Sequence, residues 1–213
     1  MIDERIVKID PKSPDRALID RAAGLLRDGA VVVAPTETRY GLLARADSQQ
    51  ALDRLYRLKN RPVSMPTAIF VGSIEEMAGH AEMNTVAEQV AAAFLPGPLT
   101  LILRARTPGN APVVVASKIG LRISSSPVIA NLVDACDFPL SATSANRSGE
   151  SESVSAEGVA AVFPEGVDLI LDAGNLELPP STVVDCSDGE VRVLREGAIS
   201  REQISAVVRK VNC

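Results

Sequence analysis

The sequence predicts a mixed α/β fold in which helices flank a β-sheet. Helical and strand patterns alternate along the chain, with no internal repeat. An apolar run at 30–34 has the composition of a strand buried on both faces, and Leu52, Leu55 and Leu58 mark one face of a helix. At 213 residues the chain is long enough to bury its own core, so we expect one domain over 1–213 with its core at about 15–200.

Local signals define the elements of the N-terminal half. Ser13-Pro14 predicts a cap and a first-turn proline for a helix that runs to about Asp28. Ser48 caps the next helix and Pro62 ends it, so that Lys59 and Arg61 fall at or just beyond its C-terminal end. The patterns also predict strands at 30–34, 40–44, 67–71 and 99–103, and helices at 74–80 and 85–94.

Turn residues separate the elements of the C-terminal half. The Pro/Gly-rich segment 107–118 and the Ser/Gly/Glu-rich segment 144–155 are both predicted to be loops. Around them the patterns predict strands at 120–124, near 140, 168–172, 182–185 and 191–194. Helices are expected at 127–136 and 156–163, and from about 200 to 211.

Composition excludes several classes of protein. The three cysteines, Cys136, Cys186 and Cys213, are odd in number and lack metal-ligand spacing, which favours a reduced, cytoplasmic location. No apolar run approaches the ~20 residues of a membrane span, and no apolar signal core follows the N-terminus, so we expect no membrane partner. A pI near 5.0 argues against nucleic-acid binding by bulk charge.

A local excess of cations stands out on this acidic chain, whose formal net charge is -5. Residues 39–61 hold two acidic side chains against six basic ones, namely Arg39, Arg45, Arg54, Arg57, Lys59 and Arg61. Arg and Lys bind phosphate and carboxylate through charge-assisted hydrogen bonds. The segment therefore indicates a site for an anionic ligand.

Several familiar catalytic signatures are absent. The sequence has neither the P-loop nor the Rossmann glycine pattern, and its single histidine, His80, fits an exposed helix end better than a catalytic triad. No cluster of His, Cys, Asp and Glu suggests a metal site. Hydroxyl and amide side chains follow or precede strands at 36–38, 141–149 and 180–182, where open sheets usually bind ligands. Taken singly, each such segment is as well explained by turn capping.

Seven motifs in order give the chain a family resemblance. They are PTETxYGL at 35–42, KxRP at 59–62, PGPxT at 96–100, LR at 121–122, SANxSG at 144–149, STVVD at 181–185 and RxGxI at 195–199. Together they make the chain similar to the YrdC/TsaC family of threonylcarbamoyl-AMP synthases, short single-domain type. That resemblance implies a twisted, mostly mixed sheet of about seven strands with a concave ligand-binding face.

The resemblance also implies a reaction. L-threonine, bicarbonate and ATP, with Mg²⁺, give threonylcarbamoyl-AMP and pyrophosphate, and the adenylate serves N6-threonylcarbamoylation of adenosine 37 in tRNA. By the same resemblance, threonine binds at Thr36, Arg122, Ala142 and Ser181. Lys59 and Arg61 are the implied catalytic cations on the triphosphate, and ATP also contacts Ser144, Asn146 and Arg195. The implied partners are tRNA and other proteins of this tRNA modification.

Some positions depart from the family pattern. Arg39 stands where a small apolar residue is usual, and Glu152 stands where a serine often meets ATP, so an acidic side chain there could repel phosphate. Met65 and Phe70 replace the Asn and His of longer relatives, as they do in short bacterial members. The effect of these departures on activity is left open by the sequence.

Two other readings compete with the synthase. One is an RNA-binding module that uses the basic residues of 39–61, although two Tyr and four Phe offer little base stacking. The other is a YciO-like paralogue with weak or different chemistry. For Lys59, taken as a loop-borne cation, we expect Lys59→Ala to abolish pyrophosphate release and to leave the melting temperature within a few degrees.

Overall fold

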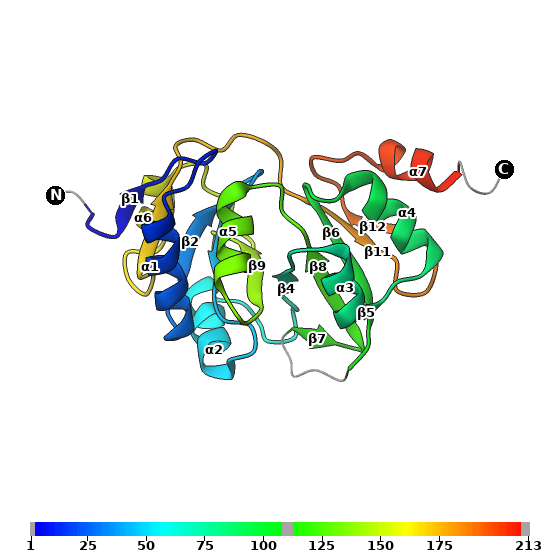
Figure 1. The fold of residues 1–213 in the computed structure, drawn as a ribbon, viewed down its shortest axis with the longest axis horizontal. Coiled ribbons are helices and arrows are strands. Elements are labelled where there is room, and N and C mark those ends of the chain that lie inside the picture. Colours follow the sequence, from blue (N-terminus) through cyan, green and yellow to red (C-terminus); the bar gives the residue numbers. More distant parts are fainter. Residues whose placement is uncertain (1–2, 108–112, 210–213) are drawn as a thin grey trace.

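The computed structural model describes residues 3–107 and 113–209 as a mixed α/β fold with one long, twisted sheet (Figure 1). Its strands follow the order β1-β10-β2-β3-β9-β4-β8-β6-β11-β12, with β5 and β7 paired at the sides of β6 and β8. The sheet combines parallel pairs such as β10/β2 and β6/β11 with antiparallel pairs such as β2/β3 and β6/β8. The predicted mixed sheet flanked by helices is confirmed.

The sheet has twelve strands where about seven were expected. The bounds of the strands are β1 Ile6–Lys8, β2 Val32–Pro35, β3 Tyr40–Leu43, β4 Ala68–Phe70, β5 Ala81–Glu82, β6 Leu99–Ala105, β7 Val114–Val115, β8 Lys118–Arg122, β9 Leu140–Ser144, β10 Leu169–Asp172, β11 Thr182–Asp185 and β12 Arg192–Arg195. No pattern predicted β1, β5 or β7, which are only two or three residues long and so too short for a period of two to show.

Seven helices are described, and most begin at a side-chain cap. They are α1 Arg16–Arg27, α2 Gln49–Lys59, α3 Ile74–His80, α4 Thr85–Phe94, α5 Pro127–Ala135, α6 Ala156–Val162 and α7 Arg201–Arg209. Ser48 caps α2 as predicted, accepting from the Ala51 amide, and Asn60 ends it in the left-handed conformation. For α1 the expected cap is wrong, because Asp15 rather than Ser13 accepts from the Leu18 amide. The predicted end of the last helix, at 210–211, lies outside the described residues.

Helices cover one half of the sheet on both faces. Residues of α1 and α5 pack on one face of β2 and β10, including Val32 and Leu171. Residues of α2 and α6 pack on the other face, against Val31, Val33 and Ile170. The run at 30–34 is therefore apolar throughout because its alternate side chains enter two different cores.

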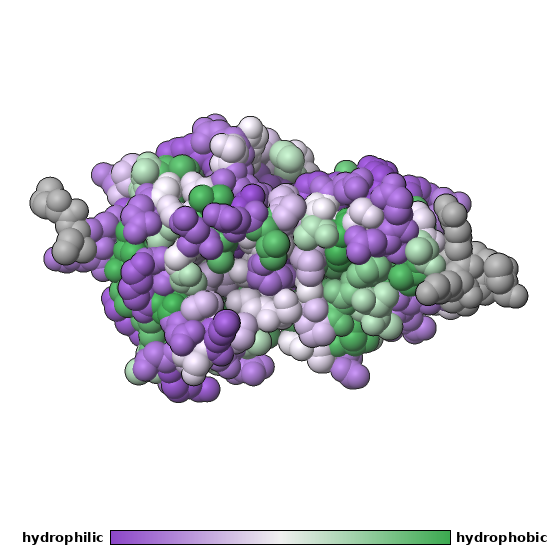
Figure 2. Space-filling view, turned by 90° about the horizontal axis from the view of Figure 1, so that it is seen from above, coloured by the Kyte–Doolittle hydropathy of each residue, from purple (hydrophilic) through white to green (hydrophobic). Residues whose placement is uncertain are grey.

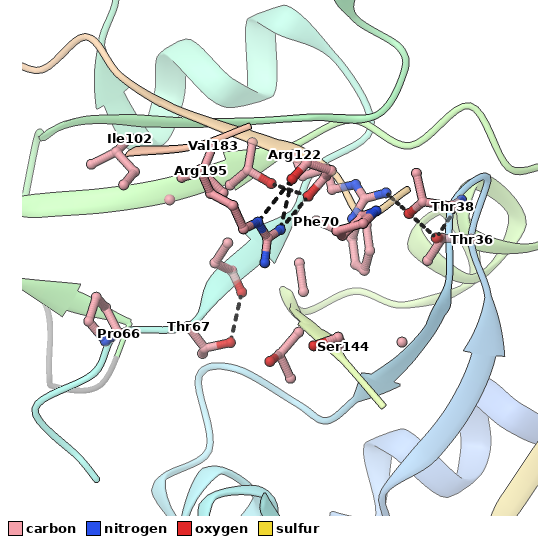
Figure 3. Close-up of a pocket in the computed structure, with 18 of the residues that line it drawn as sticks. Thr36, Thr38, Pro66, Thr67, Phe70, Ile102, Arg122, Ser144, Val183 and Arg195 are labelled. Carbon is pink, nitrogen blue, oxygen red and sulfur yellow. Dashed lines mark hydrogen bonds between the residues drawn. The ribbon is translucent and has the colours of Figure 1, made fainter. Parts of the chain in front are cut away.

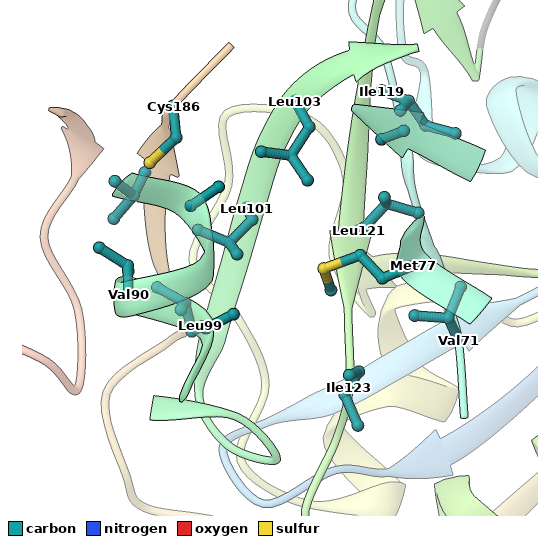
Figure 4. Packing of buried hydrophobic residues seen from close by; sticks show 14 of the residues in the cluster. Val71, Met77, Val90, Leu99, Leu101, Leu103, Ile119, Leu121, Ile123 and Cys186 are labelled. Atoms are coloured by element: carbon teal, nitrogen blue, oxygen red, sulfur yellow. The ribbon is translucent and has the colours of Figure 1, made fainter. Parts of the chain in front are cut away.

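The other half of the sheet has a helical layer on one face only. Leu99, Leu101 and Leu103 of β6 point with Ile119 and Leu121 of β8 toward the layer formed by α3, α4 and α7 (Figure 4). The alternate residues of these strands point to the opposite face. Hydrophilic side chains cover much of the molecule, with apolar patches between them (Figure 2). Among the described helices, none combines the length and apolar character needed to cross a membrane.

Candidate active site

A cavity of about 370 Å³ lies over the sheet face that the helices leave open (Figure 3). Its floor is made by alternate residues of neighbouring strands. Thr100 and Ile102 come from β6, and Lys118, Gly120 and Arg122 come from β8. The intervening residues of the same strands point into the core. Successive side chains along each strand therefore face the cavity and the core in turn. The volume is within the range of small-molecule sites.

Small residues keep this floor low. A Cβ added at Gly120 would lie 3.0 Å from the Cβ of Ala68 on the neighbouring strand β4. Ala142 of β9 pairs directly with Ala68 and also lines the cavity. Two residues earlier on β9, Leu140 belongs to the core under α5. The cavity and that core therefore share one face of the sheet, and the change from Leu140 to Ala142 opens the space.

Seven of the nine predicted site residues line this one cavity: Thr36, Arg61, Arg122, Ala142, Ser144, Ser181 and Arg195. They come from segments up to about 160 positions apart, and the sheet order brings them together. The other two, Lys59 and Asn146, lie behind the cavity wall beside Ser144. The assignment of individual roles stays a prediction, but the gathering of these residues is a property of the fold.

Arg122 is held from one side and free on the other. Its guanidinium donates to Glu37 Oε1 (2.8 Å) and Thr38 Oγ1 (3.1 Å), and its Cζ lies 5.6 Å from the centre of the Phe70 ring. The side chain is almost fully buried, yet its Nε has no acceptor. A buried guanidinium donor without a partner is costly, which favours an anionic ligand at this position.

Thr36 organises the turn between β2 and β3. Its hydroxyl donates to the Arg39 carbonyl (2.7 Å) and accepts from the amides of Thr38 and Arg39. This arrangement presents Thr38 to Arg122 and directs the Arg39 side chain into the cavity wall. Thr36 lines the cavity, but its hydroxyl proton and both lone pairs are used within the turn, so its predicted contact with threonine has only the methyl group to offer.

Arg195 and Ser181 form a second unit of the cavity wall. The Arg195 guanidinium donates from Nε and NH2 to the Ser181 carbonyl (3.1 and 2.8 Å) and from NH2 to its hydroxyl (3.1 Å) (Figure 3). Burial lowers the pKa of Arg195; the nearby Glu152 carboxylate raises it, and the charges of Arg122 and Arg61 lower it further. Three arginines share this part of the cavity with one carboxylate, and the remaining positive charge favours an anion.

Gly197 allows the two segments of this unit to meet. A Cβ at position 197 would lie 2.0 Å from the Pro180 carbonyl oxygen, and the Gly197 amide donates to Thr182 Oγ1 (3.0 Å). The Thr182 hydroxyl in turn donates to the Ile199 carbonyl (2.6 Å). The motif RxGxI is thus explained by close backbone approach, which aligns Arg195 with Ser181.

Lys59 is buried, which contradicts its description as a loop-borne or solvated cation. It is the last residue of α2 and only 1% exposed. Its ammonium donates to the backbone carbonyls of Ser144 and Asn146, the latter at 2.7 Å. Burial, reinforced by the Arg61 charge, lowers the pKa of Lys59 to about 7, and Glu152 partly offsets this. Lys59 therefore holds the loop that follows β9 in place from the side away from the cavity.

Two further predicted residues hold loops at the cavity edge. Asn146 accepts from the Ser144 hydroxyl (2.5 Å) and donates to the Glu150 carbonyl (2.7 Å), which closes the 144–150 loop. Arg61 donates to the carbonyls of Met65 (3.1 Å) and Pro66 (2.7 Å). Its guanidinium is more exposed than that of Arg122 and lines the cavity, so it remains available to a ligand that enters.

Sequence reasoning missed several residues of the cavity. Glu37 binds Arg122 and Ser124, and Thr100, Lys118 and Asp185 also line the cavity. The polar residues Thr100, Lys118 and Asp185 alternate with apolar ones on β6, β8 and β11, and this alternation was the available signal. Within the described residues, no group of three or more His, Cys, Asp and Glu could hold a metal ion.

The family model Sua5_yciO_yrdC, described as "Telomere recombination", matches residues 24–197. The chain belongs to the Sua5/YciO/YrdC family. The family resemblance carried by the seven motifs is thereby confirmed.

Curated relatives in this family have two kinds of name. Threonylcarbamoyl-AMP synthase of Bacillus subtilis is 34% identical over 209 residues, covering 95% of this chain and 60% of the relative. Threonylcarbamoyl-AMP synthase of Pyrococcus abyssi is 34% identical over 195 residues, covering 89% and 57%. Escherichia coli YciO, named an uncharacterized protein, is 29% identical over 192 residues, covering 89% and 93%. The chain thus spans less than two thirds of these two synthases.

Solved structures of the family share this fold. Pyrococcus abyssi Sua5 complexed with L-threonine has a TM-score of 0.87 at 33% identity, covering 95% of this chain and 60% of its own. Escherichia coli YciO has the same TM-score at 26% identity, covering 95% and 100%. Because synthase and YciO folds are equally similar, a distinction between them depends on the cavity side chains.

Proposed function

We propose that this protein is a threonylcarbamoyl-AMP synthase that joins L-threonine, bicarbonate and ATP and releases pyrophosphate. The observation that carries the proposal is the joining of seven motif residues from distant segments in one cavity, with Arg61, Arg122 and Arg195 around it. The names of the Bacillus subtilis and Pyrococcus abyssi relatives support it. Threonylcarbamoyl-AMP would then supply the modification of adenosine 37 in tRNA, with tRNA and the proteins that use the adenylate as later partners.

The two ends of the cavity suit different substrates. At one end Arg122 has an unpartnered buried Nε beside Thr38 and the Phe70 ring, which suits the carboxylate of an amino acid. Ser181 and the Ala142 backbone complete that end. At the other end Arg61 and Ser144 offer donors to a triphosphate, while Lys59 and Asn146 hold the Ser144 loop in place. Arg195 is bound to Ser181 and lies near both Arg122 and Arg61, so it would reach the ATP from between the two ends.

The chemistry follows from this placement. The threonine amine adds to bicarbonate, which loses water to leave a carbamate, because the cavity holds the two together. The carbamate oxygen then attacks the α-phosphorus of ATP, and the bond from that phosphorus to pyrophosphate breaks. Negative charge grows on the departing pyrophosphate, and the arginines stabilise it without a nucleophilic side chain. The cavity carboxylates Glu152 and Asp185 are both paired with cations, so Mg²⁺ would be held chiefly by the phosphates and water.

The test is pyrophosphate release by the purified protein with ATP, Mg²⁺, bicarbonate and L-threonine. Release should require both threonine and bicarbonate, and Arg122→Lys should raise the KM for threonine about 100-fold, because a lysine cannot reproduce the guanidinium fork. Release that persists without threonine or without bicarbonate would exclude the synthase. A salt-sensitive shift of tRNA without any turnover would favour the RNA-binding module instead.

A further inference from the structure

Two residues that depart from the family pattern, Arg39 and Glu152, lie against each other. Arg39 Nε is 3.8 Å from Glu152 Oε2, and both side chains are about four-fifths buried, at 20% and 18% exposure. Both also line the cavity. They belong to segments more than a hundred positions apart, so their meeting is a feature of the tertiary structure.

Arg39 and Glu152 differ in how firmly they are held. The Arg39 guanidinium also donates to the Leu176 carbonyl, which fixes it on the loop before Ser181. Glu152 sits on a short arch whose ends are anchored, with the Glu150 carbonyl bound by Asn146 and the Val154 carbonyl bound by the Leu176 amide. Its carboxylate can therefore leave Arg39 by side-chain rotation alone, while the arginine stays in place.

The contact of Glu152 is also weak compared with the other carboxylate of the cavity. Asp185 Oδ2 lies 2.7 Å from Lys118 Nζ and Asp185 Oδ1 also accepts from the Ser187 amide. At 3.8 Å, the Glu152 contact is beyond hydrogen-bond distance. A triphosphate entering beside Arg61 and Arg195 would bring several negative charges close to Glu152, and like charges at such separations repel strongly in a partly buried site.

We propose that Arg39 and Glu152 form an anion gate on the nucleotide side of the cavity. In the empty protein Glu152 neutralises Arg39; when a triphosphate enters, the carboxylate rotates out and Arg39 becomes a phosphate ligand. The gate deepens the proposed function, since it assigns the two departures a shared role in admitting ATP. It also gives a physical reason for their occurrence together, because Glu152 offsets part of the positive charge that Arg39 adds to a region already holding Arg195 and Lys59.

The test uses inorganic triphosphate as the probe and measures its Kd by calorimetry, with and without Mg²⁺. Glu152→Gln keeps the size of the side chain and removes the competing charge, so it should bind triphosphate about tenfold more tightly, equivalent to about 1.4 kcal/mol. Glu177→Gln is the matched control, because Glu177 is an exposed carboxylate beside Leu176 that does not line the cavity. Its Kd should match that of the unmodified protein.

A second variant separates displacement from simple repulsion. If Arg39 becomes a ligand once Glu152 leaves, the double variant Arg39→Gln/Glu152→Gln should bind triphosphate at least fivefold more weakly than the single variant Glu152→Gln. No loss in the double variant would overturn the gate, as would an unchanged Kd for Glu152→Gln. If Glu152→Gln bound triphosphate more weakly than the unmodified protein, and did so only in the presence of Mg²⁺, Glu152 would be a metal ligand and the proposal would be overturned.

This experiment is independent of turnover. Triphosphate binding reports on the gate, whereas threonine- and bicarbonate-dependent pyrophosphate release reports on the synthase. A protein that shows the tenfold effect of Glu152→Gln but no such release would keep the gate and lose the proposed reaction. If pyrophosphate release depended on threonine and bicarbonate but Glu152→Gln left the triphosphate Kd unchanged, the proposed reaction would stand and the gate would be refuted.

Discussion

At the scale of single residues, neighbours decide what each charged side chain of the cavity can do. Arg122 is bound by Glu37 and Thr38 but keeps an unpartnered Nε, which makes it suited to a carboxylate. Lys59 has the same formal charge but donates only within the protein, to Ser144 and Asn146. Cations that look equivalent in the sequence thus divide into one group that lines the cavity and one that lies behind its wall.

Lys59→Met should destabilise the protein, contrary to the expectation formed from the sequence. The variant leaves the buried carbonyls of Ser144 and Asn146 without a charged donor, which should lower the free energy of unfolding by about 2–4 kcal/mol. For a chain of this size the melting temperature should fall by roughly 5–15 °C, measurable by calorimetry. Arg57→Met, at an exposed position of the same helix, is the control and should change the melting temperature little.

The lowered pKa of Lys59 also predicts a pH dependence. The folded protein loses the Lys59 proton near pH 7, whereas the unfolded chain keeps it to about 10.5. Between these values the unfolded state binds more protons, so the free energy of unfolding of the unmodified protein should rise with pH relative to Lys59→Met, by about 1.4 kcal/mol per pH unit. Urea unfolding of both proteins at pH 7.5 and 9 measures this difference, and a difference that shrank with pH would contradict the lowered pKa.

At the scale of elements, strand pleat and close backbone approach place the site. On β6 and β8 the leucines and Ile119 enter the core under α3 and α4, and the intervening residues make the cavity floor. Gly197 brings the segment after β12 against the one before β11, which sets Arg195 on Ser181. The packing of the strands thus sets the positions of the side chains in the cavity.

Gly197→Ala should disturb this junction. The added Cβ would collide with the Pro180 carbonyl, so the backbone must shift and the bonds from Arg195 to Ser181 should weaken. Overpacking of this kind costs about 1–3 kcal/mol of stability, and threonine affinity should fall because Ser181 moves. Gly79→Ala, where a Cβ meets open space, is the matched control. Threonine affinity that was equal in both variants would show that Ser181 is not set by this contact.

At the scale of the whole molecule, the sheet has two halves with different coverings. Helices cover β1, β10 and β2 on both faces, while the half that contains β6, β8 and β11 has helices on one face and the cavity on the other (Figure 1). The cavity wall draws on the turn after β2, on β9 and on the segments around β11. A ligand that fills it joins parts of both halves.

Ligand binding should therefore stabilise the fold as a whole. ATP and threonine at about 100 times their Kd should raise the free energy of unfolding by about 2.7 kcal/mol each, which corresponds to a rise in melting temperature of roughly 5–10 °C. Arg122→Ala should abolish the rise caused by threonine and keep most of that caused by ATP, because Arg122 lies at the amino-acid end. A thermal-shift titration measures both, and equal loss of the two shifts would contradict the division of the cavity.

The sequence by itself determined the helices, the longer strands and seven residues that line the cavity. Amphipathic spacing, caps and the seven motifs are local signals, so they can be read without the fold. Only the tertiary structure decided that Lys59 is buried, that Glu37 holds Arg122 and that Arg39 meets Glu152. Each of these contacts joins segments about 85 or more positions apart, and no local pattern encodes such a distance. The cationic segment 39–61 predicted an anion site. The folding of the sheet decided which of its cations line the cavity, namely Arg39 and Arg61.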